Sequence, residues 1–198
     1  MLPNGVDTDY FTLPKNKTPV PGRIVFLGPT YMFPNRDSVD YFLKEIWPSI
    51  RKVNRSASLN LIGRSTEDDQ TRYNSQPYVT SLGHVDDIRP NLAEACCSIV
   101  PLRIGGGTRL KILDSWAMGK AVISTSIGCE GLRAVDEDNI LIRDDPKDFA
   151  DAVVQVISDS KLRSKLGENG RKTVEKYYSW EIVGRNMRGH YWCFCRRF

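Results

Sequence analysis

The stretch "RIGGGTRLKILDSWAMGKAVISTS", residues 103–126, places three consecutive glycines directly before an apolar helical pattern and a short apolar run. The pattern over 108–119 predicts a helix with Gly119 as its C-cap, and the run 121–126 predicts a buried strand. A glycine loop in this position has two interpretations, a cradle for phosphate or a tight turn. The order of elements around it decides the fold.

Short apolar runs alternate with helical patterns along most of the chain. The runs predict strands at 23–28, 58–63, 78–85, 96–102, 121–126 and 139–143, and the patterns predict helices at 37–53, 86–95, 108–119, 146–159 and 160–178, with a polar stretch at 64–77. Strands that alternate with helices through short loops predict parallel pairing and right-handed crossovers. The predicted fold is therefore α/β, a Rossmann-like doubly wound parallel sheet with helices on both faces.

Helix end signals refine two of these predictions. Asp37 or Ser38 is available as the N-cap of the helix at 37–53, and Pro48 is expected to kink or end its last turn. Pro146 opens the helix at 146–159, because proline is well tolerated in a first turn.

The chain divides into three predicted parts. Residues 1–22 hold four prolines and two glycines without an apolar period, which is typical of an interdomain linker. The alternating pattern fills 23–178 and predicts one domain. A helical tail follows at 179–198. No run of 18 apolar residues and no charged-then-apolar leader is present in the sequence, so neither a membrane span nor export is expected.

Composition argues against several functional classes. The net charge of +4 combines 28 basic with 24 acidic residues, which does not indicate a nucleic-acid partner. The five cysteines are odd in number and lack paired zinc-knuckle spacing, so no metal site is predicted. Cys193 and Cys195 near His190 are interpreted as an incidental cluster. Cys96 and Cys97, in an apolar run, favour a reducing, cytoplasmic setting.

The candidate site is the carboxyl end of the sheet, where ligands bind in open parallel folds. Backbone N–H groups of Gly105, Gly106 and Gly107 precede a helix N-terminus, which attracts anions. Thr108 is expected either to cap the helix or to touch a phosphate. Arg109 and Lys111 add positive charge nearby, although a capped turn with two solvated bases is an equally good interpretation of the loop alone. Asp114, two turns into the helix, is either a hydrogen-bond acceptor for ribose hydroxyls or a surface acid.

Four stretches together resemble a known family. They are "NGVDTDYF" at 4–11, "FLGPTYMFPNRDSVDYFLKEIWP" at 26–48, "GHVDDIRPNLAEACCSIVPLRIGGGTRLKILDSWAMGKAVISTSIGCEGL" at 83–132 and "YSW" at 178–180. In this order they resemble the C-terminal, donor-binding half of a GT-B glycosyltransferase of retaining family 4, the group 1 glycosyl transferases. The third stretch is the most specific of the four, and the first is similar to the linker between the two halves of such enzymes.

The resemblance implies a role for most of the candidate residues. The loop Gly105, Gly106, Gly107 and Thr108 would wrap the donor diphosphate, with Arg109 and Lys111 beside it. Asp114 matches the second acid of the family's Glu, seven residues, Glu pattern, while the first acid falls on Gly106. Val85, with His84 and Asp87, would lie against the nucleobase. Gly28 matches the loop after the first strand, where many relatives carry an Arg and a Lys, and Asn35 and Arg36 are the substitutes offered here. Glu130 would either approach the sugar or cap a turn.

The function implied by the resemblance is transfer of a sugar from a nucleotide-diphosphate sugar to a saccharide or lipid-linked acceptor. The chain is expected to be the donor-binding half, inactive without an N-terminal acceptor-binding domain as partner, with the nucleotide sugar as substrate and no cofactor or metal. Catalytic residues, nucleobase, sugar and acceptor are not assigned. A non-catalytic nucleotide-sugar-binding or interaction module, motivated by Asp114 and the missing basic pair, and a nucleotide-sugar epimerase are the alternatives. Peripheral contact with the inner face of the membrane and self-association through Trp180, Tyr191 and Trp192 are further expectations.

Overall fold

The computed structural model of the chain describes residues 4–13 and 18–195, with side chains described up to Met187. Its centre is a six-stranded sheet in the order β3-β2-β1-β4-β5-β6, in which every pairing is parallel. The strands are β1 (Arg23–Leu27), β2 (Ser58–Ile62), β3 (Val79–Gly83), β4 (Cys97–Val100), β5 (Ala121–Ser124) and β6 (Leu141–Ile142). This order reverses direction between β1 and β4, as in a Rossmann-like doubly wound fold, and confirms the predicted class.

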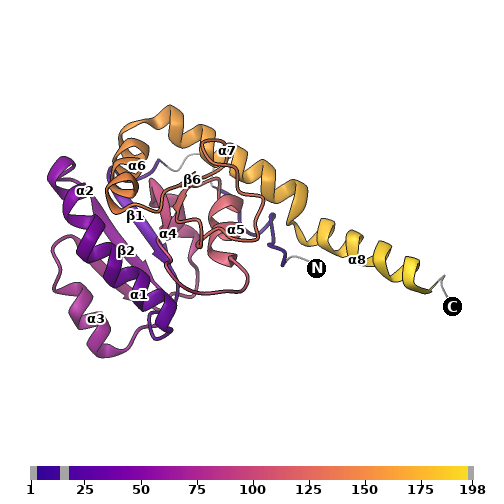
Figure 1. Ribbon diagram of the computed structural model, residues 1–198, viewed down its shortest axis with the longest axis horizontal. Coiled ribbons are helices and arrows are strands. Elements are labelled where there is room, and N and C mark those ends of the chain that lie inside the picture. Colours follow the sequence, from indigo (N-terminus) through magenta and orange to yellow (C-terminus); the bar gives the residue numbers. More distant parts are fainter. Residues whose placement is uncertain (1–3, 14–17, 196–198) are drawn as a thin grey trace.

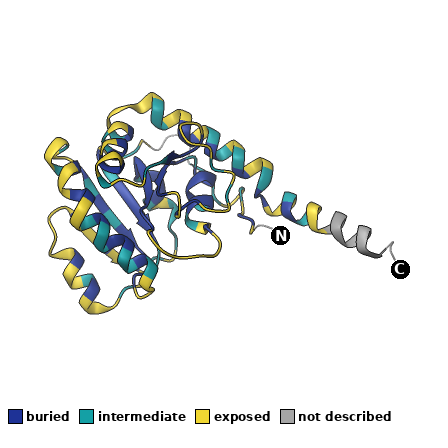
Figure 2. Ribbon diagram, in the orientation of Figure 1, coloured by how far each residue is buried: buried dark blue, intermediate teal, exposed yellow. Residues whose placement is uncertain are grey.

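Helices cover both faces of the sheet (Figure 1). They are α1 (Phe33–Tyr41), the π-helical turn η1 (Phe42–Ile46), α2 (Trp47–Val53), α3 (Glu67–Asn74), α4 (Arg89–Glu94), α5 (Leu110–Ala117), α6 (Pro146–Ser158), α7 (Ser160–Tyr177) and α8 (Trp180–Cys195). Ile24 and Phe26 of β1 belong to the core that η1, α2 and α6 cover. Val25 and Leu27 belong to the core on the other face, which α4 covers. Alternate side chains of one strand thus enter different cores. Figure 2 shows the buried strands between helices whose outer faces are exposed.

The structure corrects two predictions about helices. The helix expected from Asp37 begins at Phe33, because Pro34 occupies its first turn, and neither Asp37 nor Ser38 caps it. It also continues through Pro48, which lies in the first turn of α2 directly after η1. Proline lacks a backbone N–H and clashes with the preceding turn of an α-helix, and the wider π-helical turn accommodates it.

The polar stretch at 64–77 contains a helix that the sequence analysis did not predict. Thr66 caps α3 by accepting a hydrogen bond from the Asp69 N–H at 3.1 Å. A threonine followed three residues later by an acid is a recognised N-terminal signal, and it was present in the sequence. The expected position of Pro146 in the first turn of α6 is confirmed. Gly119 has φ of +60° and ends the turn after α5, but the C-cap itself is the preceding residue, Met118.

The start of the chain packs against the junction of α7 and α8. Val6 is buried and forms a β-bridge with Ser179, and its N–H donates to the Tyr178 carbonyl at 2.8 Å. Figure 1 shows α8 extending away from the sheet domain. Trp180, at the start of α8, is 55% exposed, whereas the side chains of Tyr191 and Trp192 lie outside the described residues. The division into linker, domain and tail, and self-association, stay predictions.

Three further findings concern the cysteines, the possibility of a membrane span and the cluster near the C-terminus. Cys96, Cys97 and Cys129 are free and buried. Among residues 4–13 and 18–195, no helix has the length and hydropathy needed to cross a membrane. The side chains of His190, Cys193 and Cys195 are outside the described residues, so the interpretation of that cluster stays untested.

Candidate functional site

An open pocket of about 360 Å³ lies at the carboxyl edge of the sheet, beside the switch point between β1 and β4. The ends of β1 and β2 and the loops after β3 and β4 contribute to it. It brings together most of the predicted site residues: Gly28, Asn35, Val85, Thr108, Lys111 and Asp114. These residues are up to 86 positions apart in the sequence, and the parallel sheet places them at one edge because every strand ends there.

The remaining lining of this pocket is mainly apolar. It comprises Leu27, Pro29, Ile62, Gly63, His84, Ile88 and Leu110. Of these, only His84 was proposed from the sequence as a nucleobase contact. Leu27 and Ile62 are the last residues of β1 and β2, and each is followed by a glycine. An apolar run that stops at a glycine is the sequence signal that would have identified them. The pocket thus has an apolar wall beside a set of polar groups, the usual composition of a small-molecule site.

The triple-glycine loop is exposed next to this pocket but does not line it. Gly105 and Gly107 have φ of +125° and +87°, conformations that side-chain-bearing residues rarely adopt. A Cβ on Gly106 would meet no atom within 4 Å. Within the described part of the chain, the backbone N–H groups of Gly105, Gly106, Gly107 and Thr108 donate no hydrogen bond. The loop therefore presents free donors ahead of α5, as an anion site requires.

Arg109, expected either beside the donor diphosphate or as a solvated base, is buried against the glycine loop. Its side chain is only 5% exposed, and its guanidinium donates to the carbonyls of Gly105 at 3.1 Å, Gly106 at 3.3 Å and Ile127 at 2.7 Å. Arg109 therefore supports the glycine loop from behind instead of facing the pocket. Its nearest carboxylate is that of Glu130, at 3.5 Å.

Thr108 does not cap α5, which removes one of its two predicted roles. The N-cap is Arg109, and no side chain accepts a capping hydrogen bond there. The Thr108 hydroxyl instead accepts a hydrogen bond from the Asn4 amide at 3.1 Å. Thr108 is exposed and lines the pocket, so its hydroxyl is placed to meet a ligand.

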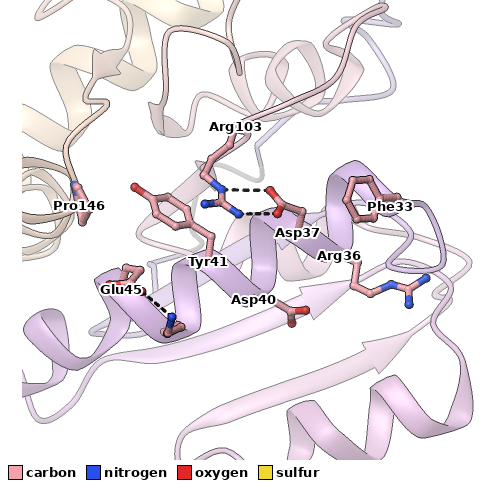
Figure 3. A pocket seen from close by; sticks show the side chains of 9 residues that line it. Phe33, Arg36, Asp37, Asp40, Tyr41, Glu45, Arg103 and Pro146 are labelled. Atoms are coloured by element: carbon pink, nitrogen blue, oxygen red, sulfur yellow. Dashed lines mark hydrogen bonds and ion pairs between the residues drawn. The ribbon is translucent and has the colours of Figure 1, made fainter.

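The other end of the glycine loop is fixed by a second arginine. Arg103 forms a two-pronged ion pair with Asp37 of α1, with Nε–Oδ2 at 3.1 Å and Nη2–Oδ1 at 2.5 Å, as Figure 3 shows. Its guanidinium also lies 4.6 Å from the Tyr41 ring centre. These residues line a separate pocket of about 440 Å³, which of the predicted binding residues contains Arg36 alone. Two arginines thus hold the loop between them.

Lys111 and Asn35 meet at the inner side of the site. The Lys111 ammonium donates to the Asn35 Oδ1 at 2.7 Å and lies 4.5 Å from the Phe26 ring centre. Burial, and secondarily repulsion from Arg109, lowers the pKa of Lys111 from 10.5 to about 7. At pH 7 about half of the molecules therefore carry this side chain as a poorly solvated cation, and binding of an anion beside it favours the charged form.

Asp114 is the acidic member of the site. It lies between the buried residues Leu113 and Ser115 and lines the pocket. Within the described residues its carboxylate makes no hydrogen bond and no ion pair. Burial raises its pKa from 3.8 to about 7. A half-buried carboxylate without a partner beside a pocket is a candidate acceptor for ligand hydroxyls.

Three residues from the resemblance lie outside the pocket lining. Asp87 pairs with Arg89 at 2.8 Å and caps the neighbouring turn, instead of pointing at a nucleobase subsite. Arg36 lines the other pocket, with its Nε 3.9 Å from Asp69. Glu130 has a side chain that is 73% exposed.

Comparison with known proteins agrees with this geometry. The model of the glycosyl transferases group 1 family matches residues 21–159, more than half of the chain. An uncharacterized glycosyltransferase of Methanocaldococcus jannaschii is 30% identical over 122 residues, which cover 60% of this chain and 34% of that protein. Residues 21–159, which the family model matches, include the sheet, the glycine loop and α5.

Solved structures share the fold. The C-terminal domain of LpcC, a group 1 family protein of Francisella tularensis, superposes with a TM-score of 0.69 at 21% identity and covers 89% of this chain and 100% of that one. Anabaena HepE, solved with UDP and glucose, superposes with a TM-score of 0.75 at 12% identity over 94% of this chain and 55% of that one. The chain thus spans about a third to a half of its longer relatives.

Proposed function

Because the chain belongs to the glycosyl transferases group 1 family, we propose that its pocket binds the nucleoside diphosphate of a nucleotide-sugar donor in a glycosyl transfer reaction. The observation that carries this proposal is the convergence of Gly28, Lys111 and Asp114 beside a loop with free N–H groups. The binding of UDP by HepE, which shares the fold, supports it.

Each part of the site suits one part of such a donor. The free N–H groups at 105–108, the N-terminus of α5 and the Thr108 hydroxyl are placed for the diphosphate. The Asp114 carboxylate accepts hydrogen bonds from the ribose hydroxyls. Its side chain is shorter by one methylene than the Glu of the family pattern. The apolar wall around Val85 contacts the nucleobase.

In the reaction, the bond between the anomeric carbon and the diphosphate oxygen breaks while the anomeric carbon bonds to an acceptor oxygen. The departing diphosphate takes the electron pair of the broken bond, and the proton of the acceptor hydroxyl passes to an oxygen of that diphosphate. Donors that are fixed before the reaction stabilise such charge at little reorganisation cost. The buttressing of the loop by Arg103 and Arg109 holds its N–H groups in place for this step.

We further propose that the acceptor, a saccharide or a lipid-linked sugar, is bound by a second domain. The chain corresponds to 55% of HepE and 34% of the M. jannaschii relative, so a further segment of comparable size accompanies this fold in those proteins. Transfer requires both substrates to be held together, and the chain alone is expected to bind the donor with little or no turnover. Retention of the anomeric configuration and peripheral membrane contact stay predictions.

A thermal titration tests donor binding. A ligand that binds only the folded state raises its stability by RT ln(1 + [L]/Kd), so UDP or GDP at millimolar concentration should raise the melting temperature. Asp114→Ala and Gly106→Val should lose most of this rise. Asp151→Ala is the matched control, because it removes one exposed carboxylate from α6, away from the pocket.

No rise with any nucleoside diphosphate would refute the proposal. A rise that persists in both site variants would place the binding site elsewhere on the chain. The epimerase alternative makes a different prediction, since it requires interconversion of a nucleotide sugar without an acceptor, which NMR of the sugar signals would detect.

A further inference from the structure

The loop after β1, residues 28–32, contains no Arg and no Lys, but the side chain of a lysine from another element lies beside it. This lysine is Lys111, which comes from the first turn of α5 and reaches across to α1. Its ammonium is 2.7 Å from the Oδ1 of Asn35, while the Asn35 Nδ2 donates to the Pro29 carbonyl at 3.0 Å. The second hydrogen bond fixes the amide so that its oxygen faces the lysine.

Gly28 makes this contact possible. A Cβ at position 28 would lie 2.9 Å from the Lys111 Nζ and 2.9 Å from the Asn35 Oδ1. Contacts under 3.0 Å essentially do not occur for a Cβ, so the lysine and the amide meet in the space that the missing side chain leaves. Gly28 also has φ of +149°, which disfavours other residues.

Lys111 has no anionic partner within the described residues. The charged and titratable groups around it are Arg109 from the preceding loop, Asp114 one turn along α5, and His84 from the loop after β3. Arg109 repels it, and Asp114 forms no ion pair with it. A poorly solvated and unpaired ammonium is unfavourable until an anion binds beside it.

We propose that Lys111, positioned by Asn35 across the gap at Gly28, is the cation that binds the donor diphosphate in this chain, since residues 28–32 after β1 supply none. This inference rests on the proposed function of the pocket. The positive charge comes from α5, and Asn35 acts as a positioning residue that orients the Lys111 ammonium.

Diphosphate binding at this lysine should be accompanied by the uptake of protons. Lys111 has a pKa of about 7 without ligand, so at pH 8 most molecules carry it neutral. A diphosphate beside the amine favours the ammonium and raises its pKa, so binding at pH 8 draws a proton from the buffer. Asp114 contributes little at this pH, because it is already mostly ionised above its pKa of about 7.

The test is calorimetric titration of the 198-residue chain with UDP and with GDP at pH 8. Repeating the titration in two buffers of different ionisation enthalpy gives the number of protons taken up per diphosphate bound. Lys111→Met should weaken binding roughly 10- to 100-fold, the usual effect of losing a hydrogen bond from a charged group, and should lower the proton uptake. Lys44→Met is the matched control, since that lysine is on the exposed face of η1 and its loss should change neither quantity.

Asn35→Asp separates positioning from simple packing. A carboxylate beside Lys111 keeps the amine charged before ligand arrives, so the proton uptake at pH 8 should fall although the lysine is retained. The added negative charge should also weaken diphosphate binding. A role of Asn35 confined to folding would leave the uptake equal to that of the unmodified chain.

The outcomes distinguish this inference from the function it rests on. If the unmodified chain binds neither UDP nor GDP, the proposed function fails and the inference falls with it. If the unmodified chain binds UDP, and Lys111→Met binds it with equal affinity and equal proton uptake, the diphosphate cation is elsewhere and only the inference is refuted.

Discussion

Asp114→Asn provides a quantitative test of the site, because it should make the protein more stable while it impairs the pocket. The Asp114 carboxylate lies on a largely buried helix, and burial raises its pKa from 3.8 to about 7. In the unfolded chain the same group ionises near 3.8. Between these two values the folded state binds more protons than the unfolded state, so the free energy of unfolding falls as pH rises.

The magnitude follows from the two pKa values. The difference between 3.8 and about 7 corresponds to about 4 kcal/mol at about 1.36 kcal/mol per pKa unit, which is a ceiling because water reaches the open pocket. Asparagine has nearly the same shape and no charge. The variant should therefore gain up to about 1.4 kcal/mol per pH unit over the parent chain from pH 4 to 7, and no more above pH 7.

The assay is urea-induced unfolding of both chains at pH 4.5, 6 and 8. For a chain of this size about 1 kcal/mol corresponds to about 2–4 °C, so thermal unfolding at pH 8 should show a rise of up to roughly 8–16 °C. Asp151→Asn, which replaces an exposed carboxylate, should leave the pH dependence unchanged. Equal stability of Asp114→Asn and the parent chain at all three pH values would refute the raised pKa of this half-buried carboxylate.

Three further predictions concern the packing and charge of the site. Gly28→Ala places a Cβ 2.9 Å from the Lys111 Nζ and should destabilise the fold by about 1–3 kcal/mol and abolish diphosphate binding, whereas Gly106→Ala, with open space around it, should stay within about 0.5 kcal/mol in thermal unfolding. Lys111→Met should remove a rise in urea resistance between pH 7 and 10.5, because the unfolded chain binds more protons there than the folded one; an unchanged rise would contradict the lowered pKa. Gly170→Ala in α7 places a Cβ 2.3 Å from the Trp116 Cδ1 and should lower stability by about 1–3 kcal/mol, and an unaltered melting temperature would show that the two helices can separate.

The fold was predictable because its signals are local. Each buried strand is a short apolar run. Several of these strands are followed by a glycine that starts the next loop, as β1 is by Gly28 and β2 by Gly63. The errors also have local causes. The capping signal at Thr66 was present but weak beside the many polar residues around α3, and the expected start at Asp37 gave too little weight to Pro34.

The site was predictable only in part, since residue type does not reveal the orientation of a charged side chain. Arg109 and Lys111 are both basic residues at the start of α5, and the sequence treats them alike. The structure turns Arg109 back onto the glycine-loop carbonyls and Lys111 into the pocket. Arg109 is the N-cap of α5 and has non-helical backbone angles, whereas Lys111 lies in the first helical turn, so the backbone conformation at the start of α5 determines which of the two meets a ligand.

The sequence by itself determined the sheet class, the glycine loop and the position of Asp114, because strand runs, glycine conformations and helix spacing depend on neighbouring residues. Only the tertiary structure decided that Asn35 and Lys111, 76 positions apart, meet at 2.7 Å over Gly28. It also decided that Asp114 and Lys111 share a pocket without pairing. Both outcomes arise because parallel strands bring distant loops to one edge, where burial, and not residue type, sets the charge of each group.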